Sequence, residues 1–337
     1  MRFCPSWANG SDGLRGRFSG PSPYFTLQHP FHTRLKGPAG PAIVSLALAA
    51  SFIFVPLLGS FTVFILPAPL AYLYLKHGPS SSAVTSLMVI GLAVIWGFPV
   101  FTMMFFGLCI CGLALGIAAE KKFPDDKAVL WGTLGPIIAV LPLAGAYLLL
   151  IGVNPIQHLD SVMNQGVAQS VGVYKQMGVS QAEIDALTPS LKTVARLIEN
   201  YFPAITFASV AATSFSAWVI LKIYARRGGI SFAEWDFSKW RLPDHLVWGV
   251  IVPGFLLIPD MPVLRIISGN ILVIFAMPYL FLGIALLVHL FDKYKLSPFL
   301  RALIYIVIAI QPILAALVWA AGFFDTWADF RKIGKKA

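Results

Sequence analysis

Long apolar stretches separated by short polar breaks follow one another from residue 41 almost to the end of the chain. A membrane-spanning helix needs roughly 17–25 mostly apolar residues, and glycine, proline and charged residues mark where such a helix stops. The pattern therefore predicts an all-α, polytopic transmembrane helical bundle. The nine candidate spans are residues 41–58, 61–75, 82–97, 99–119, 128–152, 202–224, 246–259, 266–290 and 302–322.

The stretch at 246–259 decides between eight and nine spans. It has 14 residues and contains Pro253, which suits either a short tilted span or a re-entrant helix. With eight spans, more Lys and Arg residues, including those of the C-terminal tail, lie in the cytoplasm, as the positive-inside rule favours. Both counts stay open, and with them the side of the C-terminus, whereas the N-terminus is expected in the cytoplasm.

Polar segments divide the chain further. Residues 1–40 contain five basic residues and one acidic residue among many Gly, Ser and Pro, which predicts a disordered basic N-terminal extension. Residues 153–200 carry Ser180 with Glu183 in capping-box spacing and the pair Thr188-Pro189, both typical of helix starts. They predict a short insertion of two or three amphipathic helices outside the cytoplasm.

Five segments result from these boundaries. After the extension, residues 41–152 hold about five spans, and the extracytoplasmic amphipathic segment 153–200 follows. Residues 201–324 hold three or four spans and include an interfacial segment, 228–245, in which aromatic and charged residues alternate. Residues 325–337 form an interfacial basic C-terminal tail.

The composition assigns the chain to the membrane proteins. Hydrophobic residues make up 58% of the chain and charged residues 12%, against roughly 45–50% and about 25% in soluble domains. The formal net charge of +10 comes mostly from Lys and Arg in the breaks between apolar stretches. Such residues orient a protein in the bilayer, so nucleic acid is not an expected partner.

The sequence contains no phosphate loop of Walker type, no His-Glu-x-x-His and no Gly-x-Ser-x-Gly. Cys4, Cys109 and Cys111 are interpreted as free thiols, because Cys109 and Cys111 point to opposite sides of a helix. No catalytic residue, cofactor or metal is therefore expected, and the protein is not expected to be an enzyme.

Two polar side chains, Asn270 and Gln311, lie within predicted spans. A polar side chain at that depth needs a hydrogen-bond partner in the bundle. Interhelical hydrogen bonds and contacts to a ligand are both open interpretations.

Small residues form two stripes at a spacing of four. The sixth span carries Ala204, Ala208, Ala212 and Ser216, and the fourth carries Gly112 and Gly116. Such stripes let helices approach closely. Packing inside the bundle is favoured over a docking surface for a partner membrane protein.

The tail begins where the last apolar stretch ends. Trp327 lies beside Asp325 and Arg331, which are interpreted as an interfacial ion pair. Aromatic rings that stay in lipid and charges that reach water are typical of the bilayer edge. The three residues are therefore predicted to form an interfacial anchor.

Four stretches together resemble the YybS-like family of uncharacterised bacterial membrane proteins, over about residues 40–333. They are PAPLAYLYLKHG at 67–78, WRLPDHLVW at 240–248, SGN at 268–270 and GFFDTWADFRK at 322–332. That family is distantly similar to the substrate-binding subunits of energy-coupling-factor transporters. The resemblance implies a pocket that opens outward, covered by the 153–200 segment, and an ATPase on separate subunits.

Two functional hypotheses follow. The first is a small-molecule-binding or uptake subunit that works with partner subunits. The alternative is a structural or regulatory membrane scaffold that binds other proteins and no solute. In both cases the expected location is the bacterial cytoplasmic (inner) membrane, with the lipid bilayer as the constant partner.

Overall fold

The computed structural model describes residues 37–55, 59, 61–97, 99–230, 232 and 237–331. Most of the predicted N-terminal extension and the last residues of the tail, 332–337, lie outside the described residues. In these ranges the chain forms 12 α-helices and two short 3₁₀ helices, and no strand. The α-helices are α1 (Ala39–Phe54), α3 (Pro67–His77), α4 (Pro79–Ile95), α5 (Pro99–Glu120), α6 (Asp125–Leu150), α7 (Pro155–Gln176), α8 (Gln181–Asn200), α9 (Phe202–Arg227), α10 (Trp248–Leu256), α11 (Pro262–Lys293), α12 (Pro298–Ile310) and α13 (Pro312–Ala328).

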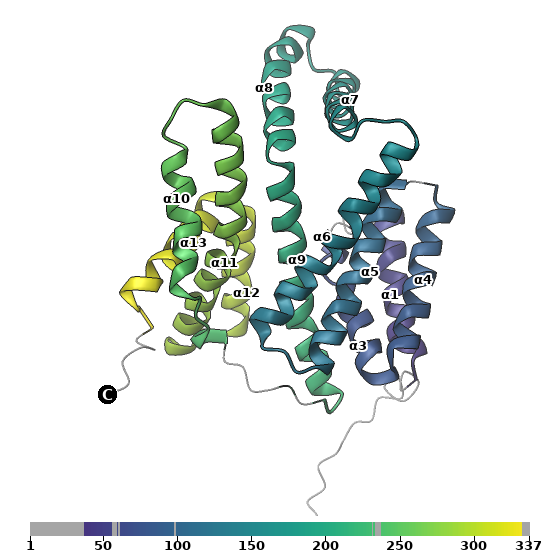
Figure 1. Cartoon of the computed structure of the whole chain (residues 1–337), viewed down its shortest axis with the longest axis vertical. Coiled ribbons are helices and arrows are strands. Elements are labelled where there is room, and N and C mark those ends of the chain that lie inside the picture. Colours follow the sequence, from purple (N-terminus) through teal and green to yellow (C-terminus); the bar gives the residue numbers. More distant parts are fainter. Residues whose placement is uncertain are drawn as a thin grey trace, which may run out of the picture.

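Two groups of helices lie side by side, with α9 between them (Figure 1). One group contains α1 and α3–α6, and its buried side chains form two apolar clusters, one of which also includes Trp218 and Leu221 of α9. The other group contains α10–α13 and has its own cluster around Val250, Tyr279 and Leu282. Helices α7 and α8 lie beyond the upper ends of α6 and α9, at a height that the hairpin of α10 and α11 also reaches (Figure 1).

The expectation of eight or nine spans is higher than the structure supports. Among the described residues, four helices are long and apolar enough to cross a bilayer, namely α5, α6, α9 and α11. The bent pair α12 and α13 counts as a fifth if it is one broken span. The apolar helices α1 and α4 are shorter.

Proline accounts for two of these differences. The predicted span at 61–75 becomes helical as α3 only from Pro67, and its 11 residues rise about 17 Å, against about 30 Å of hydrocarbon. The predicted span at 302–322 is divided at Gln311 and Pro312, where α12 and α13 meet with a bend of 106°. Proline has no N–H to continue the α12 ladder.

The stretch at 246–259 forms a helix too short to span. Helix α10 has nine residues, which rise about 14 Å. It packs along α11, so an apolar stretch of this length serves here as a short packed helix.

The 153–200 segment forms two helices of 22 and 20 residues rather than two or three short ones. The predicted capping box is present, because Ser180 accepts from the Glu183 N–H while the Glu183 carboxylate accepts from the Ser180 N–H. The Ser180 hydroxyl also donates to the Glu183 carboxylate at 2.7 Å, and this hydrogen bond, together with the one from the Ser180 N–H, lowers the pKa of Glu183. Pro189, which the sequence predicted at a helix start, lies inside α8.

Helices α11 and α13 approach each other through glycine. A Cβ atom at Gly283 would lie 2.0 Å from the carbonyl oxygen of Val318, and one at Gly322 would lie 2.2 Å from that of Tyr279. Only glycine fits at these two positions, since a methyl group would push the backbones apart.

Candidate functional site

An apolar cleft of about 230 Å³ lies between the two helix groups. Its walls come from the first turns of α6, the middle of α9, the middle of α11 and the wall segment, which we define as residues 237–246. The lining side chains in the described chain are Asp125, Asp126, Lys127, Val129, Leu130, Thr133, Phe207, Ala211, Phe215, Phe237, Trp240, Leu242, Pro243, Leu246, Met277, Pro278 and Phe281. The cleft therefore offers mainly apolar contacts at the depth of the spans, with charged groups at the α6 end.

Stacked aromatic rings close one side of the cleft. The ring centroids of Phe215 and Phe281 are 4.4 Å apart and nearly parallel, so α9 and α11 meet there. Phe237 of the wall segment packs on Phe215 at 5.4 Å and on Trp240 at 6.2 Å. The rings hold the wall segment against both helices, in an arrangement that contributes beyond simple burial.

A charge triad, defined as Asp125, Trp218 and Lys222, joins α6 to α9 at the charged end of the cleft. Lys222 Nζ lies 2.6 Å from Asp125 Oδ2, and Trp218 Nε1 donates to Asp125 Oδ1 at 2.6 Å. Asp125 and Lys222 are both buried. Because a buried charge is costly unless it is paired, the triad fixes where α6 begins relative to α9.

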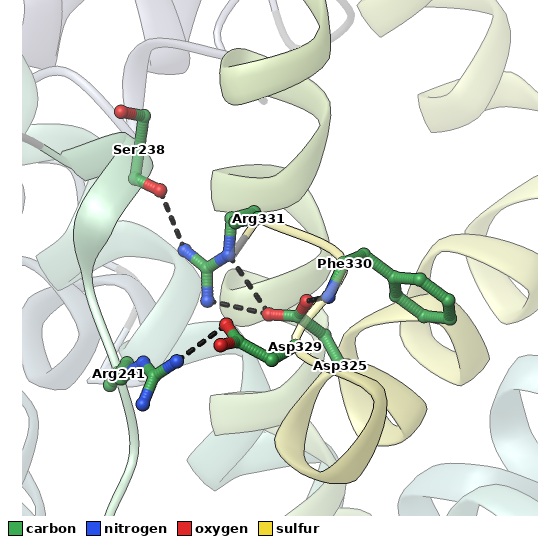
Figure 2. Close-up of polar contacts among 6 residues, drawn as sticks. All are labelled: Ser238, Arg241, Asp325, Asp329, Phe330 and Arg331. Carbon is green, nitrogen blue, oxygen red and sulfur yellow. Dashed lines mark hydrogen bonds and ion pairs between the residues drawn. The ribbon is translucent and has the colours of Figure 1, made fainter. Parts of the chain in front are cut away.

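A second buried ion pair lies on the other side of the wall segment (Figure 2). Arg331 donates through Nε and Nη2 to Asp325 Oδ2, at 2.9 and 2.6 Å, and through Nη1 to the Ser238 carbonyl oxygen at 2.7 Å. The Phe330 N–H donates to the other Asp325 oxygen. We call this set of contacts the tail clasp, because it ties the end of α13 to the wall segment.

The backbone conformation of Asp329 lets Arg331 reach Asp325. Asp329 has a positive φ of 42° and ends α13 in the left-handed conformation, which turns the chain so that Arg331 folds back onto Asp325. The Asp329 carboxylate also pairs with Arg241 of the wall segment (Figure 2).

The three predicted anchor residues therefore differ in their exposure to solvent. Trp327 is 56% exposed, and its position at the bilayer edge stays a prediction. Asp325 and Arg331 form the expected pair, but each is only 6% exposed, so they do not reach water. The prediction that these two charges reach water is therefore wrong, whereas their position at the bilayer edge stays a prediction.

Asn270 connects α11 to the junction of α8 and α9. Its Oδ1 accepts from the Ala204 N–H at 3.0 Å, and its Nδ2 donates to the Asn200 carbonyl oxygen at 2.8 Å. These partners are groups that helix ends leave unpaired. Gln311 lies at the break between α12 and α13 and is exposed, and neither residue lines the cleft.

The small-residue stripes lie at helix contacts. Gly112 and Gly116 face α3, where added Cβ atoms would come within 2.8 Å of Leu70 and 2.7 Å of Tyr74. On α9, Ala204 is fully buried, Ala208 and Ala212 are half-buried, and Ser216 donates to the Phe64 carbonyl oxygen at 2.9 Å. These contacts are internal to the chain.

The sequence interpretation missed the charge triad and the cleft. In the sequence, Asp125 falls in the charged stretch before the predicted span at 128–152 and Lys222 near the end of the predicted span at 202–224, where charge is expected at a bilayer edge. A signal was present, since Trp218 and Lys222 are four residues apart and share one face of a helix. Among the described residues, no group of three or more His, Cys, Asp or Glu could hold a metal ion.

Most of the chain matches a family of known sequences. The family model is described as "Predicted membrane protein (DUF2232)" and matches residues 43–326, a range that includes every residue lining the cleft. No curated protein matches the chain, and no solved structure matches it.

Proposed function

The chain belongs to the family of predicted membrane proteins whose model it matches, and on that premise we propose that it binds a small, largely apolar molecule in the cleft. The observation that carries the proposal is the cleft itself. Its volume of about 230 Å³ lies just below the range of about 300–1,000 Å³ typical of ligand pockets. It suits a compact molecule or the apolar chain of an amphiphile.

The chemistry of the walls supports this ligand class. The side chains from α9, α11 and the wall segment are apolar, whereas Asp126 and Lys127 are exposed at one end. A ligand would bury its apolar part between α9 and α11 and leave any polar group at that end. Both oxygens of Asp125 already accept hydrogen bonds, which favours a binding role over a catalytic one.

The proposal extends to uptake through the resemblance to substrate-binding subunits of energy-coupling-factor transporters. In this role the chain would capture the molecule, and partner subunits would supply ATP hydrolysis. The cleft differs from the pocket that the resemblance implied, because the residues described as lining it include none from 153–200.

Filling the cleft is expected to displace the ligand. In an Ala211→Phe variant, the new ring would occupy the cleft between Phe207 and Phe215, and the amount of copurifying small molecule is expected to fall at least fivefold. Untargeted mass spectrometry of extracts from detergent-purified protein measures this amount.

The matched control is Ala146→Phe. It adds the same ring at an exposed position of α6, far along the helix from the turns that line the cleft. The control is expected to retain the ligand. Equal ligand content in all three proteins, or no enriched small molecule in any of them, would contradict the proposal.

A scaffold role is the second candidate, and α7 and α8 favour it. They lie beyond the upper ends of α6 and α9 (Figure 1) and expose apolar side chains such as Val173, Val194 and Leu197. A stoichiometric protein partner in the same purification, without an enriched small molecule, would favour the scaffold.

For location, we propose the bacterial cytoplasmic membrane with both termini in the cytoplasm. Arg226 and Arg227 end α9, and the positive-inside rule places such residues in the cytoplasm. The tail clasp ties Arg331 to the segment that follows them, so the tail is expected on the same side.

Fusion reporters test this topology. Green fluorescent protein fused after Ala337 is expected to fluoresce, and alkaline phosphatase at the same site is expected to be inactive, because phosphatase folds only outside the cytoplasm. Phosphatase inserted after Gly178, between α7 and α8, is the control expected to be active. An active phosphatase after Ala337 would contradict the assignment.

A further inference from the structure

We propose that Arg331 is a positioning residue for the cleft: through the tail clasp it holds the wall segment in place, and so determines whether the cleft retains its ligand. The inference rests on the proposed function for the ligand, whereas the position of the wall segment can be measured without one. It assigns the C-terminal tail a role in binding although no tail residue lines the described cleft.

The wall segment depends on outside contacts for its position. It lies between α9 and α10 in the chain, and its regular structure consists of the short 3₁₀ helix η2 (Phe237–Lys239) and most of η3 (Asp244–Val247). Such short helices supply few hydrogen bonds of their own. Yet the wall segment contributes five of the side chains that line the cleft, including Trp240 and Leu242.

The end of the chain holds this segment at two points, the tail clasp and a separate ion pair. Arg331 Nη1 donates to the Ser238 carbonyl oxygen at 2.7 Å, and Arg241 pairs with Asp329 (Figure 2). Ser238 lies between Phe237 and Trp240, so the bond to its backbone fixes the part of the segment that carries two lining rings.

Burial makes the first point the stronger of the two. The side chains of Arg331 and Asp325 are 1% and 3% exposed, whereas those of Arg241 and Asp329 are 48% and 27% exposed. Exposed pairs contribute little to stability. A buried guanidinium whose three nitrogens all donate has, by contrast, a single well-defined position.

The alternative is that the clasp only stabilises the end of α13. The two roles differ in one observable, the accessibility of the wall segment. If Arg331 only stabilises α13, its removal lowers the melting temperature without exposing the cleft side of the segment. If it positions the wall, the cleft side is exposed while the rest of the protein stays folded.

The test labels a single cysteine on the wall. Leu242→Cys is introduced where Cys4, Cys109 and Cys111 have been replaced by alanine, and its reaction rate with a maleimide is measured in membranes. The main variant is Asp325→Asn with Arg331→Met, because removing both charges avoids a buried unpaired carboxylate. We expect labelling to accelerate at least fivefold and ligand retention to fall at least fivefold, with little change in melting temperature.

Two further variants make the result specific. Arg331→Lys keeps the charge but loses the forked geometry, and its labelling rate is expected between those of the wild type and the double variant. Asp292→Asn with Arg301→Met removes another Arg–Asp pair of the same helix group, at 2.8 Å, whose residues do not line the cleft. This control is expected to label at the wild-type rate.

An unchanged labelling rate in the Asp325→Asn, Arg331→Met variant would overturn the positioning role, and so would an equal acceleration in the Asp292→Asn, Arg301→Met control. A wall that loosens with no loss of a ligand that the wild type carries would also overturn it. A wall that loosens in a protein that never carries an enriched small molecule would support the positioning of the wall and overturn the proposed function instead.

Discussion

Replacing Lys222 with Met is expected to lower the free energy of unfolding by about 3–5 kcal/mol, because it leaves the Asp125 carboxylate buried and unpaired. Lys222 Nζ lies 2.6 Å from Asp125 Oδ2, and both side chains are less than one-tenth exposed. The bilayer adds to this cost, since a lone charge among apolar helices has little access to water. The effect is measured as the loss of folded protein on heating or on titration with a denaturing detergent.

The double variant Asp125→Asn with Lys222→Met separates the pair from its burial. It removes both charges, and Trp218 keeps an oxygen acceptor at position 125, so the loss is expected to be smaller than for Lys222→Met alone. Such non-additivity is the signature of two groups in direct contact. For comparison, Arg265→Met breaks the exposed pair with Asp260 and is expected to cost at most about 1 kcal/mol. Equal losses in the single and double variants would contradict the account of the triad.

Adding one methyl group at Gly283 is expected to destabilise the protein by about 1–3 kcal/mol, the range for overpacking a close contact. The new Cβ would lie 2.0 Å from the Val318 carbonyl oxygen. That oxygen belongs to the backbone of α13 and cannot rotate away, so the two helices must separate. Thermal unfolding of the Gly283→Ala variant in detergent measures the change.

Gly254→Ala is the matched control in the neighbouring helix α10. A Cβ there meets no atom within 4 Å. The substitution is therefore expected to leave the free energy of unfolding unchanged or to raise it by about 0.5–1 kcal/mol, the usual advantage of alanine over glycine within a helix. A Gly283→Ala protein that unfolds at the same temperature as this control would show that α11 and α13 are not closely packed there.

The sequence predicted the long helices well, and it did not predict where α3, α12 and α13 begin and end. The predicted spans at 99–119 and 202–224 correspond to α5 and α9 within a few residues, because each helix has proline at its first or second position and charged residues follow each apolar stretch. The stretch at 302–322 is as apolar as these, yet it bends by 106° at Gln311. An apolar composition indicates that lipid or protein surrounds a segment, but it does not indicate whether the helix axis bends within that segment.

The candidate site was harder to predict, because its contacts join distant parts of the chain. Asp125 and Lys222 are 97 positions apart, and Ser238 and Arg331 are 93 apart. The charged members of these pairs, Asp125, Lys222 and Arg331, each lie near the end of an apolar stretch, where the positive-inside rule and the bilayer edge explain charge equally well. Only the fold distinguishes a buried partner from an exposed anchor, as the contrast between Arg331 and Trp327 shows.

The most direct test of ligand binding in the cleft is photo-crosslinking. Benzoylphenylalanine replaces Phe207, which lines the cleft, or Phe299, which is 80% exposed on α12, and the adducts formed in membranes are identified by mass spectrometry. Our account predicts one enriched small-molecule adduct at position 207, absent at position 299 and lost when Ala211→Phe fills the cleft. The same mixture of bulk lipid adducts at both positions, unaffected by Ala211→Phe, would contradict it.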